Sequence, residues 1–290
     1  MDFSPVTLEQ QEQYLELYSI TPQKASDYSF TNLWGWAEEY KLQWAWDKDL
    51  VWIRQQLPQP QSWAPVGDWH RVNWNAWAKE NPGFEMIRAP ETLIQILKSG
   101  DLEVEVFETR GSWDYIYRVD ELSELKGNRF HKKKNLVNQF RKKYDFAYLE
   151  FGKGMVEQAL SMQDDWCMWR DCEAHATLSA ENRAIKRILS HWDKLRHLKG
   201  GAILVDDVMV CYTIAEQISD EMLVIHFEKG NPSYKGSYQA INKIFLEQFD
   251  GPCTLVNREQ DLDDEGLRKA KLSYNPVDFI RKNRIVISPR

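Results

Sequence analysis

Apolar and polar residues follow two different spacings in the second half of the chain. Short alternating or continuous apolar runs, which are typical of strands, are separated by stretches whose apolar residues lie three or four apart, which is typical of helices. The apolar runs predict strands at about 146–151, 201–205, 208–218, 222–228, 253–257 and 284–287. The helical spacing predicts helices at about 155–172, 180–197, 240–249 and 265–270. The expected order is one strand, two helices, three strands, and then helix and strand in alternation.

The first half mixes the same two patterns less regularly. Residues 7–10 read Thr-Leu-Glu-Gln, which fits a capping box at the start of a helix. The proline-rich stretch 57–67 is expected to be irregular, because proline donates no ladder hydrogen bond. Further elements are expected as a helix at 30–40, a hairpin at 42–53, a helix at 91–98 and strands at 102–107 and 113–119. This half is therefore predicted to be a mixed α and β domain.

The balance of charge changes near residue 125. Residues 1–125 contain 10 Lys and Arg against 21 Asp and Glu, whereas residues 126–290 contain 27 against 23. Ten of the 13 tryptophans precede residue 114, and we expect them mainly in the first core. A length of 290 residues also corresponds to about two domains at roughly 150 residues each. We predict two domains, residues 1–125 and residues 126–290.

The composition excludes a disordered chain and a membrane-spanning one. Hydrophobic residues make up 43% and charged residues 28%, as in globular proteins. No apolar run approaches the roughly 18 residues that span a bilayer, and the first residues lack the basic and apolar regions of a signal peptide. We expect a soluble cytoplasmic protein with no transmembrane segment.

The cysteines and histidines predict neither a disulfide scaffold nor a metal site. Four cysteines are few for a chain of this length, and none are in a CxxC arrangement. We expect all four, Cys167, Cys172, Cys211 and Cys253, to be reduced and mostly buried. The six histidines form no HxH or HxxxH pair.

A loop after the expected strand 222–228 could hold an anion. A glycine just before a helix lets backbone amides approach a phosphate, and the helix N-terminus adds about half a positive charge. The alternative is that Gly236 serves only a turn and that Lys235 is solvated. The candidate binding residues are Tyr234, Lys235, Gly236, Ser237, Tyr238 and Gln239.

The element order and this loop together resemble an acetyltransferase-like domain of the GNAT type. In that family two central parallel strands splay apart, and the following helix begins at a loop of the form Pro-x-x-basic/aromatic-x-Gly. The resemblance implies a coenzyme A thioester as one candidate donor, with no tightly bound cofactor. This sequence has Ser237 and Tyr238 where the family has a second small residue, so the Tyr238 ring would compete with a pyrophosphate.

Two ionisable side chains share one face of the expected strand 222–228. His226 and Glu228 are two residues apart, and side chains alternate along a strand. Such groups are costly to bury without partners, so Glu228 is a candidate general base with His226 orienting it. The alternative is a buried structural ion pair with Lys229 or Arg258.

A dense run of charges, Asn257 to Pro276, carries a more specific resemblance. Together with HFEKGNPSYKGSYQAIN, KGNRFHKKKNLVNQF and DYSFTNLWGW, it resembles the bacterial family grouped with the C-terminal domain of phosphatidylglycerol lysyltransferase. The resemblance covers nearly the whole chain. It implies two tandem GNAT-like domains and kinship with enzymes that take an aminoacyl group from a charged tRNA, but no particular substrate. Lipid lysylation is not the expected reaction, because the chain lacks the membrane-spanning region of the lipid-modifying relatives.

A basic helix is expected at about 128–143. Residues 126–143 contain eight Lys and Arg and no acidic residue. Cations on one side and apolar residues on the other suit an RNA backbone such as that of tRNA, while an anionic membrane surface or solvent alone are the alternatives. The candidate RNA-binding residues are Arg129, Lys132, Lys133, Lys134, Arg141 and Lys142.

These observations favour an acyl- or aminoacyltransferase whose second domain carries the site, while a degenerate first domain shapes the cleft. The donor is aminoacyl-tRNA or acyl-coenzyme A, and the acceptor is an amine or hydroxyl of a small molecule or peptide. A transfer reaction needs a base, an oxyanion donor and a proton for the leaving group. The candidate catalytic residues are Glu228, His226, Tyr274 as proton donor, Asn257 and Glu259, and the candidates for holding donor phosphates are Arg258, Lys269 and Lys271. The alternative function is a non-catalytic ligand-binding or regulatory module on the same scaffold.

Overall fold

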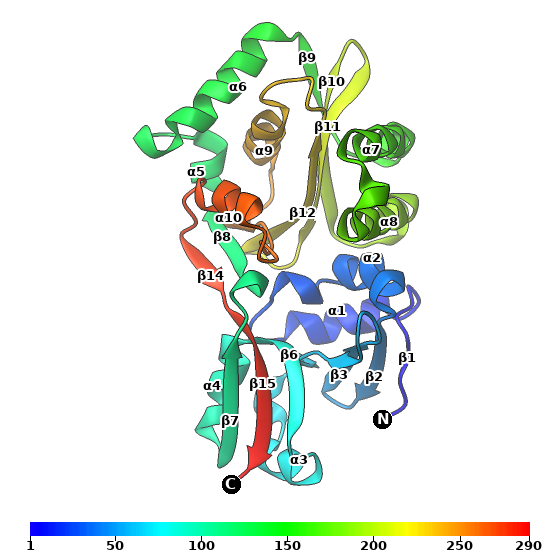
Figure 1. Cartoon of the computed structure of the whole chain (residues 1–290), viewed down its shortest axis with the longest axis vertical. Helices are drawn as coiled ribbons and strands as arrows, with labels where there is room; N and C mark the ends of the chain where they lie inside the picture. The colour runs from blue at the N-terminus through cyan, green and yellow to red at the C-terminus, as the bar shows by residue number, and fades with distance from the viewer. The chain divides into compact units, whose positions relative to one another are not determined.

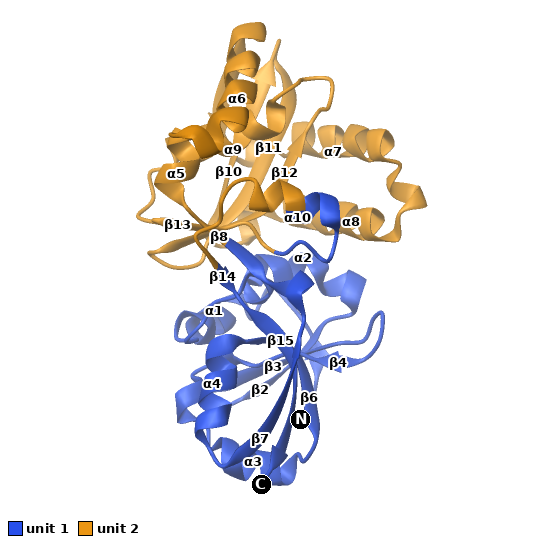
Figure 2. Ribbon diagram, turned by 60° about the vertical axis from the view of Figure 1, so that its left-hand side comes forward, with its two compact units in different colours: residues 1–115, 260–268, 279–290 blue, residues 116–259, 269–278 orange.

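The polypeptide passes four times between two structural units of the computed structural model, which describes residues 1–290 (Figure 2). Unit 1 comprises Met1–Tyr115, Gln260–Arg268 and Phe279–Arg290, and unit 2 comprises Ile116–Glu259 and Lys269–Asp278. Both units mix helices and strands, as the sequence predicts. None of the helices combines the length and the apolar composition that crossing a membrane requires.

The boundaries of these units differ from the predicted division at residue 125, because strands that are far apart in the sequence pair with one another. The C-terminal strand β15 (Lys282–Pro289) lies between β6 (Phe84–Pro90) and β7 (Leu102–Glu108), all in unit 1. Residues 116–118 instead pair antiparallel with a strand of unit 2. Charge and composition change near residue 125, but neither property reports such long-range backbone pairing.

Unit 1 contains two sheets. One has the order β1-β2-β3-β4, with β5 also paired to β3, and the other has the order β6-β15-β7. The strands of the first sheet are β1 (Ser4–Pro5), β2 (Gln43–Asp47), β3 (Leu50–Gln55), β4 (Gln61–Ser62) and β5 (Val66–Gly67). The helices are α1 (Gln11–Ser19), α2 (Phe30–Tyr40), α3 (Trp74–Glu80) and α4 (Glu91–Ser99). The two short strands β4 and β5 lie in the stretch predicted to be irregular, and their length of two residues fits the spacing of the prolines.

Local sequence explains the best-defined parts of unit 1. Helix α2 begins where the Ser29 hydroxyl accepts a hydrogen bond from the Asn32 amide at 3.3 Å, an N-cap. Strands β2 and β3 form the predicted hairpin. Trp44 is fully buried, and the Trp52 ring stacks on the Trp77 ring with centroids 5.0 Å apart. These tryptophans therefore build the core of this unit, as expected.

Unit 2 is organised around a sheet with the order β14-β8-β13-β12-β11-β10-β9. The strands are β8 (Asp114–Arg118), β9 (Phe146–Glu150), β10 (Leu198–Val205), β11 (Val208–Gln217), β12 (Met222–Gly230), β13 (Leu255–Asn257) and β14 (Asp278–Ile280). The helices are α5 (Val119–Glu124), α6 (His131–Lys143), α7 (Val156–Arg170), α8 (Ala176–Ser190), α9 (Ser237–Gln248) and α10 (Glu265–Leu272), the last of which begins in unit 1. Figure 1 shows α7 and α8 on one face of this sheet and α6 and α9 on the other.

The packing of α6 on α9 fixes the start of α9. Gly236 caps α9 with a φ of 92°, and a Cβ atom there would lie 2.5 Å from the Leu136 carbonyl oxygen of α6. Phe140 of α6 and Ala240 and Ile241 of α9 belong to one buried cluster that also contains residues of β10 and β11. A glycine is required at position 236 because the α6 backbone comes too close for any side chain.

Candidate functional site

The two parallel strands of unit 2 separate where the predicted catalytic residues begin. Strands β12 and β13 pair only from Met222–Leu255 to Val224–Asn257, although β12 continues to Gly230. Beyond Val224 side chains connect the two segments in place of backbone hydrogen bonds. The candidate residues on both segments therefore line one gap, and their bonding shows how that gap is filled.

His226 forms the first bridge across the gap. Its Nδ1 lies 2.8 Å from Glu259 Oε1 and its Nε2 lies 3.1 Å from Glu216 Oε2 on β11. The side chain is completely buried. Burial alone would lower the pKa of His226, but hydrogen bonds to the two carboxylates raise that pKa to about 9. His226 is therefore a charged imidazolium at neutral pH that donates both N–H groups.

A bulge in β12 explains why His226 does not orient Glu228 as predicted. Phe227 pairs with Ile214 and Ile225 pairs with Ala215, so His226 is the extra residue between two adjacent pairs. A bulge interrupts the simple alternation of side chains and re-aims the extra one. Both ring nitrogens face Glu216 and Glu259, which leaves neither for Glu228.

Glu228 forms the second bridge. Its Oε1 accepts a hydrogen bond from Asn242 Nδ2 of α9 at 2.7 Å, and its Oε2 accepts one from Arg258 Nη2. The side chains of Glu228 and Arg258 are only 11% and 14% exposed. Burial would lower the pKa of Arg258, but the Glu228 carboxylate holds it above its ordinary value. Both carboxylate oxygens of Glu228 accept a hydrogen bond, as expected for the alternative of a buried structural ion pair with Arg258. The role of Glu228 as a general base stays a prediction.

Asn257 and Tyr274 lie next to these bridges. Asn257 is fully buried, and its Oδ1 accepts a hydrogen bond from the Glu259 amide at 2.8 Å, which holds Glu259 at a positive φ of 56°. Tyr274 is 6% exposed, and burial raises its pKa to about 12. Tyr274 therefore keeps its proton at neutral pH, as a proton donor must.

Two cations contact the Tyr274 ring, and a third is bonded to the backbone of one of them. The Arg258 guanidinium lies 4.6 Å and the Lys133 amine of α6 4.2 Å from the centre of the Tyr274 ring. Lys271 of α10 donates a hydrogen bond to the Arg258 carbonyl at 2.5 Å. Lys269, the other predicted phosphate-binding lysine, is exposed. The structure thus brings Arg258 and Lys271 together and adds Lys133, which the sequence assigned only to the basic helix.

The side chain of Tyr238 in the glycine loop is bonded to α7. The Tyr238 hydroxyl accepts a hydrogen bond from Trp166 Nε1 of α7 at 2.8 Å, and a Cβ atom on Gly230 would lie 3.1 Å from the Tyr238 ring. The Ser237 amide donates to the Tyr234 carbonyl at 3.0 Å. Lys235 is exposed and Gln239 is partly exposed. Gly236 is explained by its packing on α6, and the predicted approach of its amides to a phosphate stays a prediction.

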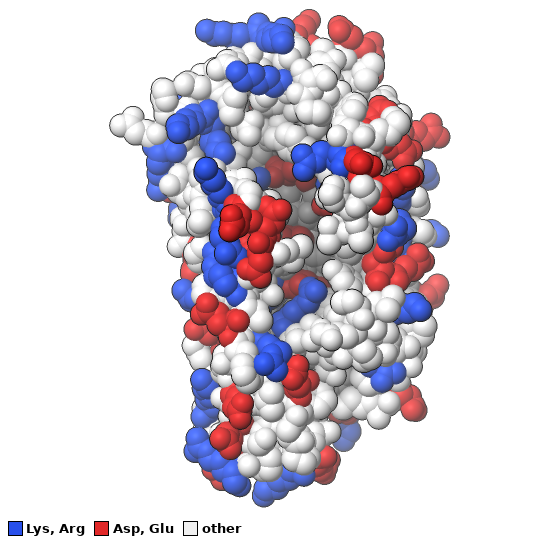
Figure 3. Space-filling model, in the orientation of Figure 1, with Lys and Arg blue, Asp and Glu red and all other residues white.

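The exposed cations of α6 lie along one edge of unit 2 (Figure 3). Lys132, Lys134 and Lys142 are exposed. Arg141 forms an ion pair with Glu247 at 3.0 Å, and Arg129 forms one with Glu121. Of the six predicted RNA-binding residues, three lysines are therefore exposed, two arginines already face a carboxylate, and Lys133 is half-buried against the Tyr274 ring.

The most highly bonded carboxylate of the charged run was not predicted. Asp261 of unit 1 is fully buried and accepts two hydrogen bonds from Arg268, each 2.8 Å long, and one from the Tyr115 hydroxyl at 2.5 Å. Burial would raise the pKa of Asp261, but these donors lower it to about 2. The sequence signal for this contact was the seven-residue spacing between Asp261 and Arg268. The hydrogen-bond network around Asp261 accounts for several of the charged residues between 257 and 276.

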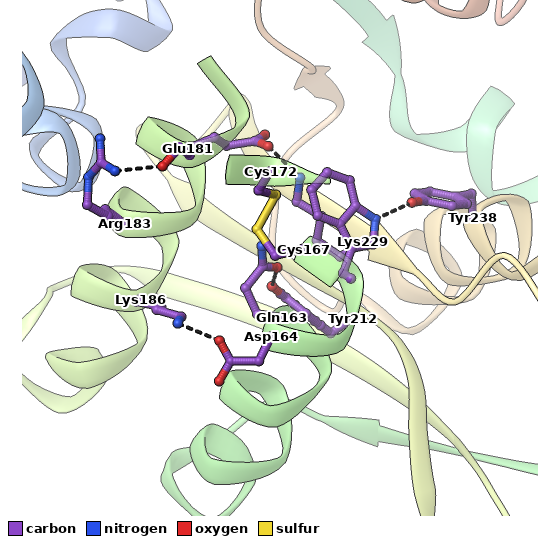
Figure 4. Close-up of a disulfide and its surroundings, with 12 residues drawn as sticks. Gln163, Asp164, Cys167, Cys172, Glu181, Arg183, Lys186, Tyr212, Lys229 and Tyr238 are labelled. Atoms are coloured by element: carbon purple, nitrogen blue, oxygen red, sulfur yellow. Dashed lines mark hydrogen bonds and ion pairs between the residues drawn. A yellow bond between two sulfur atoms is a disulfide. The ribbon is translucent and has the colours of Figure 1, made fainter. Parts of the chain in front are cut away.

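The structure corrects one expectation about the cysteines. Cys167 at the end of α7 and Cys172 form a disulfide, so these two are not free thiols (Figure 4). Cys211 and Cys253 are free and buried, as expected. Spacing outside a CxxC motif did not reveal this bond, because the left-handed residue Asp171 turns the chain back at the end of α7.

A buried lysine lies beside the disulfide. Lys229 is 5% exposed, its amine donates to Glu181 Oε2 at 2.7 Å, and it lies 3.7 Å from the centre of the Trp166 ring. Burial lowers the pKa of Lys229. Figure 4 shows Lys229, Glu181 and Cys172 grouped on the α7 and α8 side of the sheet. Lys229 is therefore separate from Glu228, which faces α9.

The fold and these bridges define a mixed α/β protein whose two central parallel strands separate at a cluster of charged side chains. The chain belongs to the family described as phosphatidylglycerol lysyltransferase, C-terminal, whose model matches residues 18–285.

Similarity to individual proteins extends over most of the chain. A conserved protein of unknown function from Bacteroides thetaiotaomicron is 29% identical, with a TM-score of 0.88 and 99% of both chains covered. The structure of L-PGS from Bacillus licheniformis has a TM-score of 0.61 at 11% identity, covering 96% of this chain and 90% of that one, which shows the fold alone. An uncharacterized protein of Mycoplasmoides gallisepticum is 25% identical over 189 residues, which are 63% of this chain and 58% of that protein.

Proposed function

We propose that the protein is an aminoacyltransferase that takes an aminoacyl group from a charged tRNA and transfers it to an amine or hydroxyl acceptor. The observation that carries the proposal is the family match over residues 18–285. The family is named for a lysyl transfer reaction, and the sequence resemblance implies kinship with enzymes that use charged tRNA. The acceptor is proposed to be a small molecule or a peptide.

The basic helix α6 supports an RNA donor. Val137 and Phe140 are buried and anchor the helix, while Lys132, Lys134 and Lys142 remain exposed. Lysines that contact phosphates supply affinity without reading a base sequence. The negatively charged backbone of a tRNA donor is complementary to this row of exposed lysines.

A coenzyme A thioester is the less supported donor. Tyr238 lies in the loop where the pyrophosphate would bind, and its hydroxyl is hydrogen bonded to Trp166. The Ser237 amide of this loop already donates to the Tyr234 carbonyl at 3.0 Å, so a pyrophosphate would have to compete for it. We therefore place aminoacyl-tRNA ahead of acyl-coenzyme A.

We further propose that each unit is a GNAT-like domain, with unit 2 carrying the site and unit 1 a degenerate copy. Unit 2 supports this assignment through its order of strand, two helices, three strands, helix and strand from β9 to β13. The separation of β12 and β13 after Val224 is the splay expected of that fold.

The reaction places specific demands on the residues of unit 2. The acceptor attacks the ester carbonyl of the aminoacyl-tRNA, loses a proton, and the 3′ oxygen of the RNA leaves with a proton. Tyr274 is the proposed proton donor. Glu228 would have to accept the proton beside the hydrogen bonds that Asn242 and Arg258 already donate to it, so Glu228→Gln is the decisive variant for that role.

A second candidate function is a non-catalytic module that binds RNA or a small ligand. The specific observation in its favour is the filled gap: Glu228 and His226 each bond two partners, so the side chains close the separation of the strands. In that case the charged cluster stabilises unit 2 and performs no chemistry.

A transfer assay separates the two candidates. Purified protein is incubated with tRNA charged with labelled amino acids and a mixture of amines and peptides, and labelled product is separated from tRNA. We expect protein-dependent transfer that is lost on ribonuclease treatment and reduced in the triple variant Lys132→Ala, Lys134→Ala, Lys142→Ala. The matched control replaces three exposed lysines of unit 1, Lys48, Lys79 and Lys98. Binding of tRNA without transfer of any amino acid would support the module.

A further inference from the structure

A small group of cations lies between α6, the end of β13 and α10. Lys133 and Arg258 contact the Tyr274 ring, and Lys271 donates a hydrogen bond to the Arg258 carbonyl. The carboxylate bonded to Arg258 is Glu228, which also accepts a hydrogen bond from Asn242. Lys133 has no such carboxylate partner.

Two of these cations have unused hydrogen-bonding capacity. Arg258 Nη1 is buried and has no hydrogen-bond partner. The Lys133 amine is held by the Tyr274 ring and has no ion-pair partner, and burial together with the nearby Arg258 charge lowers the Lys133 pKa. A buried donor without a partner is destabilising, so the unpartnered Arg258 Nη1 beside a second cation is expected where a ligand completes the site.

The group is reachable from solvent at its rim. Lys133, Arg258, Lys271 and Gln239 are all partly exposed. Gln239 lies in the first turn of α9 and hydrogen bonds to Tyr274, which brings the positive end of a 12-residue helix to the same place. Arg258 Nη1 itself is buried, and the Lys133 amine is close enough for the Arg258 charge to lower the Lys133 pKa.

We propose that Lys133, Arg258 and Gln239 form a binding site for a single phosphate group. The proposal rests on the proposed function for the source of that phosphate, which is taken to be one backbone phosphate of the donor RNA. A nucleotide phosphate, such as that of coenzyme A, offers the same chemistry. Arginine and lysine match a phosphate because both donate charge-assisted hydrogen bonds, and the Tyr274 ring contacts both cations.

The test measures binding, so that it does not depend on transfer activity. Fluorescence anisotropy follows a labelled, uncharged RNA minihelix in a salt series, and thermal unfolding is followed with inorganic phosphate or coenzyme A. The variants are Lys133→Gln, the conservative Lys133→Arg and the control Lys79→Gln, whose lysine is an exposed residue of unit 1. Circular dichroism confirms folding of each variant.

We expect inorganic phosphate to raise the unfolding temperature of the wild type and of Lys79→Gln but not of Lys133→Gln. The minihelix should bind Lys133→Gln about tenfold more weakly than Lys79→Gln, with a salt slope reduced by about one, and Lys133→Arg should restore binding. Equal behaviour of Lys133→Gln and Lys79→Gln with both probes overturns the site. Stabilisation by coenzyme A but no difference in RNA binding overturns the RNA source and retains the phosphate site.

The outcomes for the site and for the proposed function remain distinguishable. Phosphate binding that depends on Lys133 but no aminoacyl transfer rejects the transferase and keeps the site. Transfer that is unaffected by Lys133→Gln, with no phosphate effect, rejects the site and keeps the transferase.

Discussion

The bridge formed by His226 predicts a loss of stability in mild alkali. The pKa of His226 is raised from 6.5 to about 9 in the folded protein, so the folded state binds the proton more tightly than the unfolded chain. The contribution is fully present below pH 6.5 and is lost as the pH rises through about 9. Above that range the neutral imidazole leaves Glu216 and Glu259 buried with one donor between them.

The size of the effect follows from the shift. A shift of one pKa unit corresponds to about 1.4 kcal/mol, so the shift of His226 contributes about 3 kcal/mol at low pH. Over the window from pH 7 to 9.5 the linkage relation gives a loss of about 2 kcal/mol. This is a large fraction of the total stability of a typical domain, about 5–15 kcal/mol.

The assay is urea unfolding of the wild type and of His226→Gln at several values between pH 7 and 9.5. Glutamine can donate to one carboxylate but does not titrate, so the variant should be less stable at pH 7 and should depend less on pH. Subtracting the two curves removes the titration of other groups that both proteins share. Equal pH dependence in the two proteins would refute the charged bridge, whatever the difference in absolute stability.

Three further predictions follow from the same contacts. Gly236→Ala should destabilise unit 2 by about 1–3 kcal/mol, because the added methyl group meets the Leu136 carbonyl and the backbone there has a positive φ. Thermal unfolding measures the effect, and Gly154→Ala, whose Cβ meets nothing within 4 Å, is the control. The Asp261 pKa is lowered from 3.8 to about 2, so the stabilisation by its carboxylate is present above pH 4 and is lost as the pH falls through about 2. Asp261→Asn should therefore reduce the dependence of unfolding on acidic pH more than Asp263→Asn, whose side chain is 74% exposed. Reduction of the Cys167–Cys172 bond should lower stability by at most about 2 kcal/mol, because it closes a short loop; Cys167→Ser should be insensitive to the reductant.

The sequence predicts the parts of the fold that depend on local pattern. The three-strand run from β10 to β12 has continuous apolar or alternating residues, and α2 was placed at its observed bounds because Ser29 caps it and its apolar face is regular. The predicted helix 180–197 is observed as Ala176–Ser190, because residues 192–194 form a separate 3₁₀ turn. Pattern therefore fixes the existence of an element better than its ends.

The candidate site was predictable only in part, because its contacts are long-range. The charged run from Asn257 and the strand holding Glu228 do meet, as expected of neighbouring strands. An alternating sequence pattern gives no sign of the bulge at His226. Because of this bulge, His226 bonds to Glu216 and Glu259 and not to Glu228, its predicted partner. Lys133 was predicted only as an RNA-binding residue of the basic helix, since no sequence signal places α6 beside Tyr274.

A single geometric fact links the structural and functional interpretations of unit 2. Strands β12 and β13 stop pairing after Val224, and the polypeptide must then satisfy that gap with side chains. His226 and Glu228 do so by forming closed bridges, which makes them poor candidates for groups that exchange protons at each turnover. Arg258 is different, because Glu228 occupies one of its terminal nitrogens and leaves the other without a partner. The residue that closes the gap is thus also the one that can bind an anion, so chemistry in this unit should depend on how a substrate phosphate is held at Arg258 more than on a free carboxylate base.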